Sequence, residues 1–160
     1  MIHTSVRVDG VNKTLKVLKN LDPDIRKQFN KDAKVILRPV VDDAKSRYPA
    51  NYLSGMGRSW ETGRIFPYTQ ARARRGVKVS VKQEKDGTLL KITQTDAAAS
   101  VIEFAGATTS NQLGRNLSRG FGRTGRVMWP AFVAHANDIQ TGIQDLVDEV
   151  ATRATVELKL

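Results

Sequence analysis

Apolar and polar residues alternate at the start of the chain, and the spacing then changes. Every second residue from Ile2 to Val8 falls on one face, which is typical of a half-buried strand. Asp9 and Gly10 predict a turn. Between Val11 and Leu18 the apolar residues recur at helical spacing instead. We therefore predict a first strand followed by a short helix.

A longer helical pattern follows, from Pro23 to about Arg47. Asp22 precedes the proline, and Asp-Pro is a common helix start because proline suits the first helical position. The apolar stripe comprises Ile25, Phe29, Ala33, Ile36, Val40 and Ala44. Pro39 lies within the pattern, so we expect the helix to bend or break there.

A β-hairpin is predicted in the middle of the chain. Valines alternate with polar residues from Val77 to Gln83, and the segment Glu84–Gly87 reads EKDG, a hairpin turn. The return strand is predicted to reach about Thr95. Its lysines give the hairpin a basic polar face.

Two further helices are predicted. Asp96 is a suitable N-cap for a short helix from Ala97 to about Phe104, with Gly106 ending it. The last helix opens at Pro130. Its amphipathic stripe consists of Phe132, Ala136, Ile139, Ile143, Leu146, Val150 and Ala154.

The remaining segments, at about 50–73 and 107–127, are rich in glycine and polar residues and are expected to be long loops. With 160 residues, 40% of them hydrophobic, the chain suits a single domain spanning 1–160. The predicted fold class is α+β. We expect a small antiparallel sheet, formed by the N-terminal strand and the hairpin, to pack against two long helices.

Charge adds an expectation about partners. The formal net charge is +10, which favours acidic partners such as nucleic acid or acidic protein surfaces. The charge is uneven: residues 1–95 hold 20 Lys+Arg against 9 Asp+Glu, and residues 131–160 hold 2 against 5. Such asymmetry suits head-to-tail contacts between copies, although solvated faces explain it equally well. No run is long and apolar enough to predict a membrane span.

Gly120, Gly122 and Gly125 match the G-x-G-x-x-G spacing of a dinucleotide-binding loop. That loop must follow a strand and open a helix, so that the phosphates meet the helix N-terminus. Here no predicted strand precedes Gly120, and the next helix is expected only near Pro130. We therefore do not interpret the glycines as a nucleotide site.

Candidate catalytic groups are few. The chain has no cysteine, and its two histidines, His3 and His135, lack carboxylates at metal-ligand spacing. Asp42 and Asp43 are adjacent on a predicted helix, so they point to different sides instead of converging as an acid–base pair. We predict no enzyme activity, no cofactor, no metal site and no small-molecule substrate.

Arginine-rich segments are the main candidates for contacts, at Gln70–Lys78 and Gly114–Arg126. Three interpretations stay open: a grip on nucleic acid, a solvated loop, or an arm that becomes ordered on assembly. The candidate residues are Arg72, Arg74, Arg75, Arg115, Arg119, Phe121, Arg123 and Arg126. Arginine forks suit carboxylates, so we expect a neighbouring copy to offer Asp145, Asp148 and Glu149.

Several short motifs occur in an order that resembles one family. They are the segment AKVILRPVVDDAKSRYP at 33–49, Ser54-Gly55-Met56, the set Ala99, Glu103 and Gly106, and VMWPAF with Pro130 and Ala131. Together they resemble the neck proteins of long-tailed bacteriophages, the head–tail joining and tail-completion family.

The resemblance implies a structural virion protein that forms a homo-oligomeric ring at the junction of capsid and tail. It implies other neck and tail proteins as partners, DNA passing nearby, and a location in the virion after assembly in the host cytoplasm. The alternative is a basic nucleic-acid-binding protein that uses its arginine–glycine segments.

Overall fold

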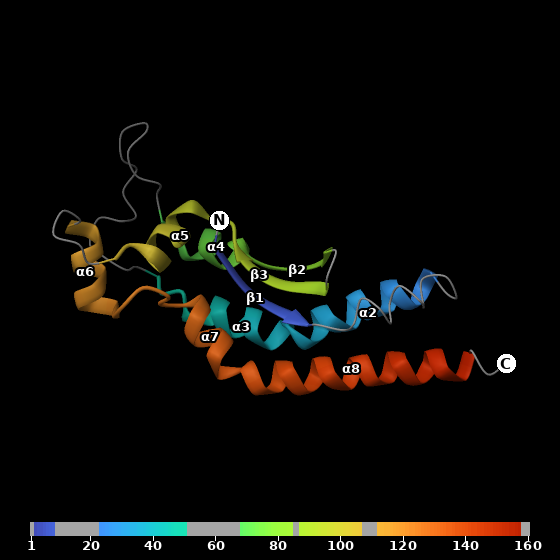
Figure 1. Cartoon of the computed structure of the whole chain (residues 1–160). Coiled ribbons are helices and arrows are strands. Elements are labelled where there is room, and N and C mark those ends of the chain that lie inside the picture. The colour runs from blue at the N-terminus through green and yellow to red at the C-terminus, as the bar shows by residue number, and fades with distance from the viewer. Residues whose placement is uncertain (1, 9–22, 51–67, 85–86, 107–111, 158–160) are drawn as a thin grey trace. The chain divides into compact units, whose positions relative to one another are not determined.

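The computed structural model of the chain describes residues 2–8, 23–50, 68–84, 87–106 and 112–157 (Figure 1). It mixes helix and strand and is mostly helical in the described part. The helices are α2 (Pro23–Ile36), α3 (Arg38–Arg47), α4 (Gln70–Gly76), α5 (Ala97–Phe104), α6 (Gln112–Phe121), α7 (Met128–Ala134) and α8 (Ala136–Glu157). The strands are β1 (Ile2–Val8), β2 (Val77–Glu84) and β3 (Gly87–Gln94), in the order β1-β3-β2.

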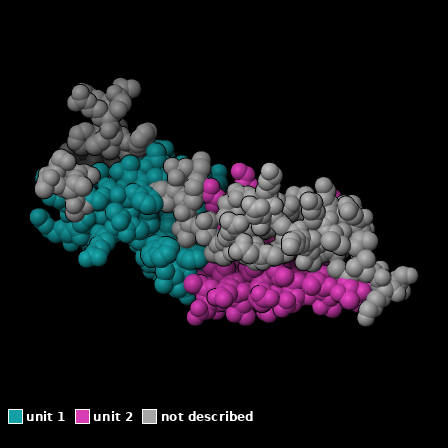
Figure 2. Space-filling view, viewed as in Figure 1, with its two compact units in different colours: residues 1–4, 40–78, 92–134 teal, residues 5–39, 79–91, 135–160 magenta. Residues whose placement is uncertain are grey.

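The chain divides into two compact units, coloured separately in Figure 2. Unit 1 comprises residues 1–4, 40–78 and 92–134, and unit 2 comprises residues 5–39, 79–91 and 135–160. Each unit is therefore built from three separate stretches of chain. The expected single domain over residues 1–160 stays a prediction.

The interruption expected near Pro39 is confirmed. α2 ends at Ile36 and α3 begins at Arg38, while the Leu37 amide still donates to the Ala33 carbonyl at 3.2 Å. Pro39 thus lies in the first turn of α3, where a missing backbone N–H leaves no helical bond unmade. The proline is accommodated because a new helix starts around it.

The hairpin and the short helix after it are also confirmed. β2 and β3 are separated by residues 85 and 86, which lie outside the described residues, as does the predicted helix at Val11–Leu18. α5 spans Ala97–Phe104, and the Asp96 side chain accepts from the Ala99 amide at 2.9 Å as the predicted N-cap.

The loop predicted at 107–127 is wrong between residues 112 and 121, which form α6. Its glycines argued against a helix, but packing overrides that weak preference. Leu117 of α6 is fully buried, and Gly114 on the same helix is also buried. Residues 107–111 lie outside the described part.

The loop predicted at 50–73 is likewise wrong at its end, where α4 begins at Gln70. Ala73 is fully buried and Gly76 is buried, so α4 is held by its inward face. Residues 51–67, including the Ser54-Gly55-Met56 motif, lie outside the described residues.

The last predicted helix is two helices. α7 begins at Met128, two residues before Pro130, and the chain leaves helical geometry at His135 before α8 starts. The apolar stripe on α8 is confirmed, since Ile139, Ile143, Leu146 and Val150 are buried. In the described residues, no helix combines the length and apolarity needed to cross a bilayer.

Within unit 2, α2 packs against α8. Phe29 and Ala33 of α2 are buried, as is the stripe on α8. The two helices approach closely at Gly142, where a Cβ atom would lie 3.1 Å from Ile36 Cγ2. In unit 1 the large buried apolar side chains include Tyr48, Tyr68, Ile102, Leu117 and Met128.

Candidate anion-binding pocket

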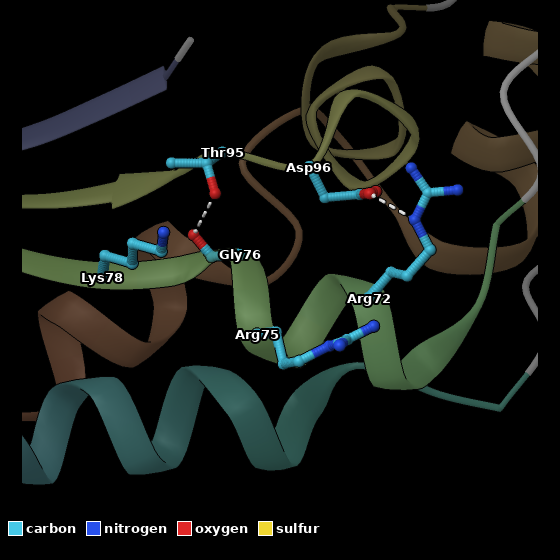
Figure 3. Close-up of a pocket in the computed structure, with 6 residues that line it drawn as sticks. All are labelled: Arg72, Arg75, Gly76, Lys78, Thr95 and Asp96. Carbon is cyan, nitrogen blue, oxygen red and sulfur yellow. Dashed lines mark hydrogen bonds and ion pairs between the residues drawn. The ribbon is translucent and has the colours of Figure 1, made fainter.

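An open pocket of about 320 Å³ lies in unit 1, where α4 passes into β2 beside the junction of β3 and α5 (Figure 3). Three cationic side chains border it. The lining residues are Arg72, Arg75, Gly76, Lys78, Thr95 and Asp96.

Local sequence places the arginines. Thr69 has an extended backbone and caps α4, because its Oγ1 accepts from the Arg72 amide at 3.3 Å. With Ala73 facing the core, Arg72 and Arg75 are three residues apart on the exposed side of the helix. α4 ends at Gly76, and Lys78 follows at the start of β2.

Gly76 is required by a close approach. Its carbonyl accepts from the Thr95 amide at 2.9 Å and from Thr95 Oγ1 at 3.2 Å. A Cβ atom at this position would lie 1.8 Å from Gln94 Oε1 and 2.9 Å from the Asp96 amide nitrogen. Only a residue without a side chain lets α4 meet the end of β3 in this way.

Gln94 lies beside the pocket and is fully buried. Its Nε2 donates to the Tyr48 hydroxyl and to the Ala73 carbonyl, each at 2.9 Å. Its Oε1 accepts from the Asp96 amide at 2.7 Å. One amide group therefore joins three segments of chain beside the pocket.

Two buried tyrosines of unit 1, Tyr48 and Tyr68, stay neutral at neutral pH. Burial raises the pKa of Tyr68 to about 12, and its hydroxyl donates to the Pro49 carbonyl at 2.7 Å. Burial also raises the pKa of Tyr48 well above its ordinary value. Neither phenol adds negative charge near the cations at neutral pH.

Asp96 is the one acidic side chain lining the pocket, and both of its oxygens are engaged. Oδ1 caps α5, and Oδ2 lies 3.4 Å from Arg72 Nε. Three cations against one carboxylate leave a net positive pocket whose guanidinium groups suit phosphate or carboxylate oxygens. The arrangement favours binding of an anion. In the described residues, no group of acidic or histidine side chains is placed to hold a metal ion.

A second polar cluster in unit 1 surrounds Glu103, which is 1% exposed. Its carboxylate accepts from the Val127 amide at 3.0 Å and from the Met128 amide at 2.8 Å. It therefore caps α7 from a distant point in the sequence. Burial nevertheless raises the pKa of Glu103, and the amide hydrogen bonds and Arg126 only partly offset that effect.

Arg126 joins α5 and α6. Its guanidinium donates to the carbonyls of Ile102, Ala105 and Gly122 and to Ser118 Oγ. These carbonyls belong to the C-terminal ends of α5 and α6, which lack partners within their own helices. Arg126 is thus engaged inside its own chain, and the subunit or partner contact expected of it stays a prediction.

The other candidate arginines lie in different parts of unit 1 and have different contacts. Arg72 and Arg75 share the pocket, whereas Arg74 Nε donates to the Lys45 carbonyl at 3.1 Å at the end of α3. Arg115 and Arg119 are exposed on α6, and Arg115 donates to Gln112 Oε1 at 2.8 Å.

Phe121 and Arg123 are exposed at the end of α6 and just after it. The acidic candidates Asp145, Asp148 and Glu149 are exposed on α8 in unit 2. Asp148 accepts from Gln144 and Glu149 from Arg153, both on their own helix.

Sequence reasoning missed Lys78 and Thr95 as lining residues of the pocket and Gln94 as the buried amide beside it, and it interpreted Asp96 only as a cap. The cap signal was present in the sequence, but nothing local indicates that β3 ends against α4. Glu103 was noticed only as part of a motif, and its burial follows from a contact between residues 24 positions apart.

Comparisons of the chain with protein-family models, with curated proteins and with solved structures found no match.

Proposed function

We propose that this chain is a structural protein of the phage neck, a ring-forming head–tail connector or a tail-completion or tail-terminator component. Its partners are then copies of itself and other neck and tail proteins, in a virion assembled in the host cytoplasm, with DNA passing close by. The proposal includes the finer fold expectation, a three-stranded sheet packed on two long helices.

One contact carries the proposal. Glu103 belongs to one of the motifs that resemble the neck family, and Val127 and Met128 begin another. The two motifs are far apart in sequence, yet the Glu103 carboxylate accepts from both amides. If the chain has the architecture of that family, we expect these two motifs to contact each other.

Exposed apolar side chains in unit 1 support an assembly role. Trp129 and Val133 of α7 are more than half exposed, as is Phe104 of α5. Side chains of this kind are enriched at protein interfaces and costly to leave in water. A subunit that buries them against neighbours gains stability that the isolated chain lacks.

A deletion in the phage that encodes the chain tests the proposal. Removal of the gene should leave capsids and tails that do not join or that fail to stay closed, visible by electron microscopy. A plasmid copy should restore normal particles. Normal, infectious virions from the deletion strain would contradict the proposed role.

The pocket favours a second candidate function, binding of nucleic acid through phosphate contacts. Arg72, Arg75 and Lys78 surround one opening and present donors for phosphate oxygens. Substitution of all three by alanine should weaken binding to short duplex DNA. Since each phosphate contact contributes about 0.9 to the slope of log affinity against log salt, the slope should fall by about 2–3.

The same titration carries its own control. Lys31 and Lys34 are exposed on α2 and do not line the pocket, so their double alanine variant removes charge and leaves the lining residues unchanged. An equal loss of slope in both variants would indicate diffuse charge attraction and would exclude the pocket as the phosphate site.

A further inference from the structure

A groove of about 350 Å³ runs between α2 and α8 in unit 2. Four of its lining residues are apolar or lack a side chain: Val35, Ile36, Gly142 and Leu146. Gly142 lets α8 approach α2 closely, because a Cβ atom there would lie 3.1 Å from Ile36 Cγ2. Val35 is 60% exposed, so it offers apolar surface at the groove.

The other lining residues of the groove are acidic. Asp32 stands on α2, and Asp145 and Glu149 stand one turn apart on α8. α8 as a whole carries five acidic residues and one arginine. A groove lined by both apolar residues and carboxylates fits a side chain with an aliphatic stem and a cationic end, which describes arginine.

α6 carries the complementary pattern. It contains Arg115 and Arg119 and no acidic residue. The two arginines are four residues apart, as Asp145 and Glu149 are, so both pairs are spaced by about 5–6 Å along their helices. Each arginine is exposed, and Arg115 also donates to Gln112 Oε1 on the surface of its own helix.

We infer that the α2–α8 groove of one copy binds Arg115 and Arg119 on α6 of a second copy. The inference rests on the proposed function, because it supplies the contact by which copies join. The two surfaces differ, so the contact is head-to-tail, and repetition leads to a closed ring when the rotation between copies closes.

Charge reversal of each surface tests the inference. The variant Arg115→Glu with Arg119→Glu keeps an intact groove, and the variant Asp145→Lys with Glu149→Lys keeps an intact α6. All four residues are exposed, so both variants should fold, which circular dichroism and thermal unfolding check. We expect each variant alone to remain monomeric by sedimentation velocity where the wild type assembles.

Mixing the two variants gives the decisive result. Every contact between unlike copies is then matched, intact α6 against intact groove and reversed α6 against reversed groove, so the mixture should assemble with the two variants in a 1:1 ratio. A chain with all four substitutions should also assemble, because the reversed charges match. A mixture that stays monomeric, or no recovery in the fourfold variant, overturns the inference.

A matched control separates position from net charge. Asp24→Lys with Asp42→Lys changes the net charge by the same amount at exposed sites outside the groove, and this variant should assemble like the wild type. The failure of the inference is distinct from that of the proposed function. If the wild type and the groove variant assemble equally, only the inferred contact at the groove is contradicted. If the wild type never assembles, the proposed ring is contradicted as well.

Discussion

At the scale of single residues, buried polar groups hold the described part of unit 1 together. Gln94 makes three hydrogen bonds from a fully buried amide, and Glu103 and Arg126 together engage the ends of α5, α6 and α7. Such groups are costly when a partner is lost, because the remaining donor or acceptor is left buried and unpaired.

Gln94→Ala should therefore lower the free energy of unfolding by about 2–4 kcal/mol, since it unpairs the Tyr48 hydroxyl, the Ala73 carbonyl and the Asp96 amide and leaves a cavity. Urea unfolding followed by circular dichroism measures the change. Gln112→Ala on the exposed face of α6 is the control and should change stability by less than about 0.5 kcal/mol. A similar small effect for both variants would show that the Gln94 network is not structural.

Glu103 gives a pH prediction with a definite sign. Burial raises its folded pKa above the unfolded value, so the folded state holds the proton to higher pH than the unfolded chain does. The neutral side chain thus contributes stability that is fully present below about pH 4 and is lost as pH rises through the folded pKa. Relative to Glu103→Gln, which cannot titrate, the wild type should lose stability over that window.

Unfolding free energies of the wild type and Glu103→Gln, measured between pH 4 and pH 8, provide the comparison. Other carboxylates titrate in both proteins and cancel in the difference. A difference that is flat, or that favours the wild type increasingly as pH rises, would contradict the burial of this carboxylate.

Sequence reasoning was informative for residues whose role is local. Asp96 could be identified as a cap because capping depends on the next three residues. Gln94 and Arg126 could not, since most of their partners lie 8 to 46 residues away and no local pattern encodes such contacts.

At the scale of elements, periodicity predicted the hairpin, α5 and the stripe on α8, where packing and pattern agree. It failed at α6, because Gly114 and Gly120 lower helix preference and the burial of Leu117 compensates only in the folded chain. It also merged α7 with α8, since the interruption at His135 leaves the apolar spacing unchanged.

Two neighbouring glycines test whether α6 is a helix that ends where the structure places its end. Gly120 is helical with open space around it, so Gly120→Ala should stabilise the protein by about 0.5–1 kcal/mol. Gly122 has φ +82° just past the helix, so Gly122→Ala should destabilise it by about 1–2 kcal/mol. Thermal unfolding of the two variants measures both changes in stability. Changes of the same sign would contradict a helix that ends between Gly120 and Gly122.

At the scale of the whole molecule, charge is the feature that links sequence, structure and proposed role. The basic pocket and the exposed arginines of α6 belong to unit 1, and the acidic groove belongs to unit 2. The charge asymmetry was visible in the sequence, but its concentration into a pocket and a groove depends on tertiary packing. Contacts between such surfaces are screened by salt, so assembly should weaken as ionic strength rises.

The central claim is that identical copies close around a common axis. Sedimentation velocity over a wide concentration range, at low and high salt, tests it most directly. We predict that the mass rises from the 17.7 kDa of one chain to a single fixed multiple and then stops, at lower concentration in low salt than in high salt. A mass of one chain at every concentration and salt, or growth without limit, would contradict the claim.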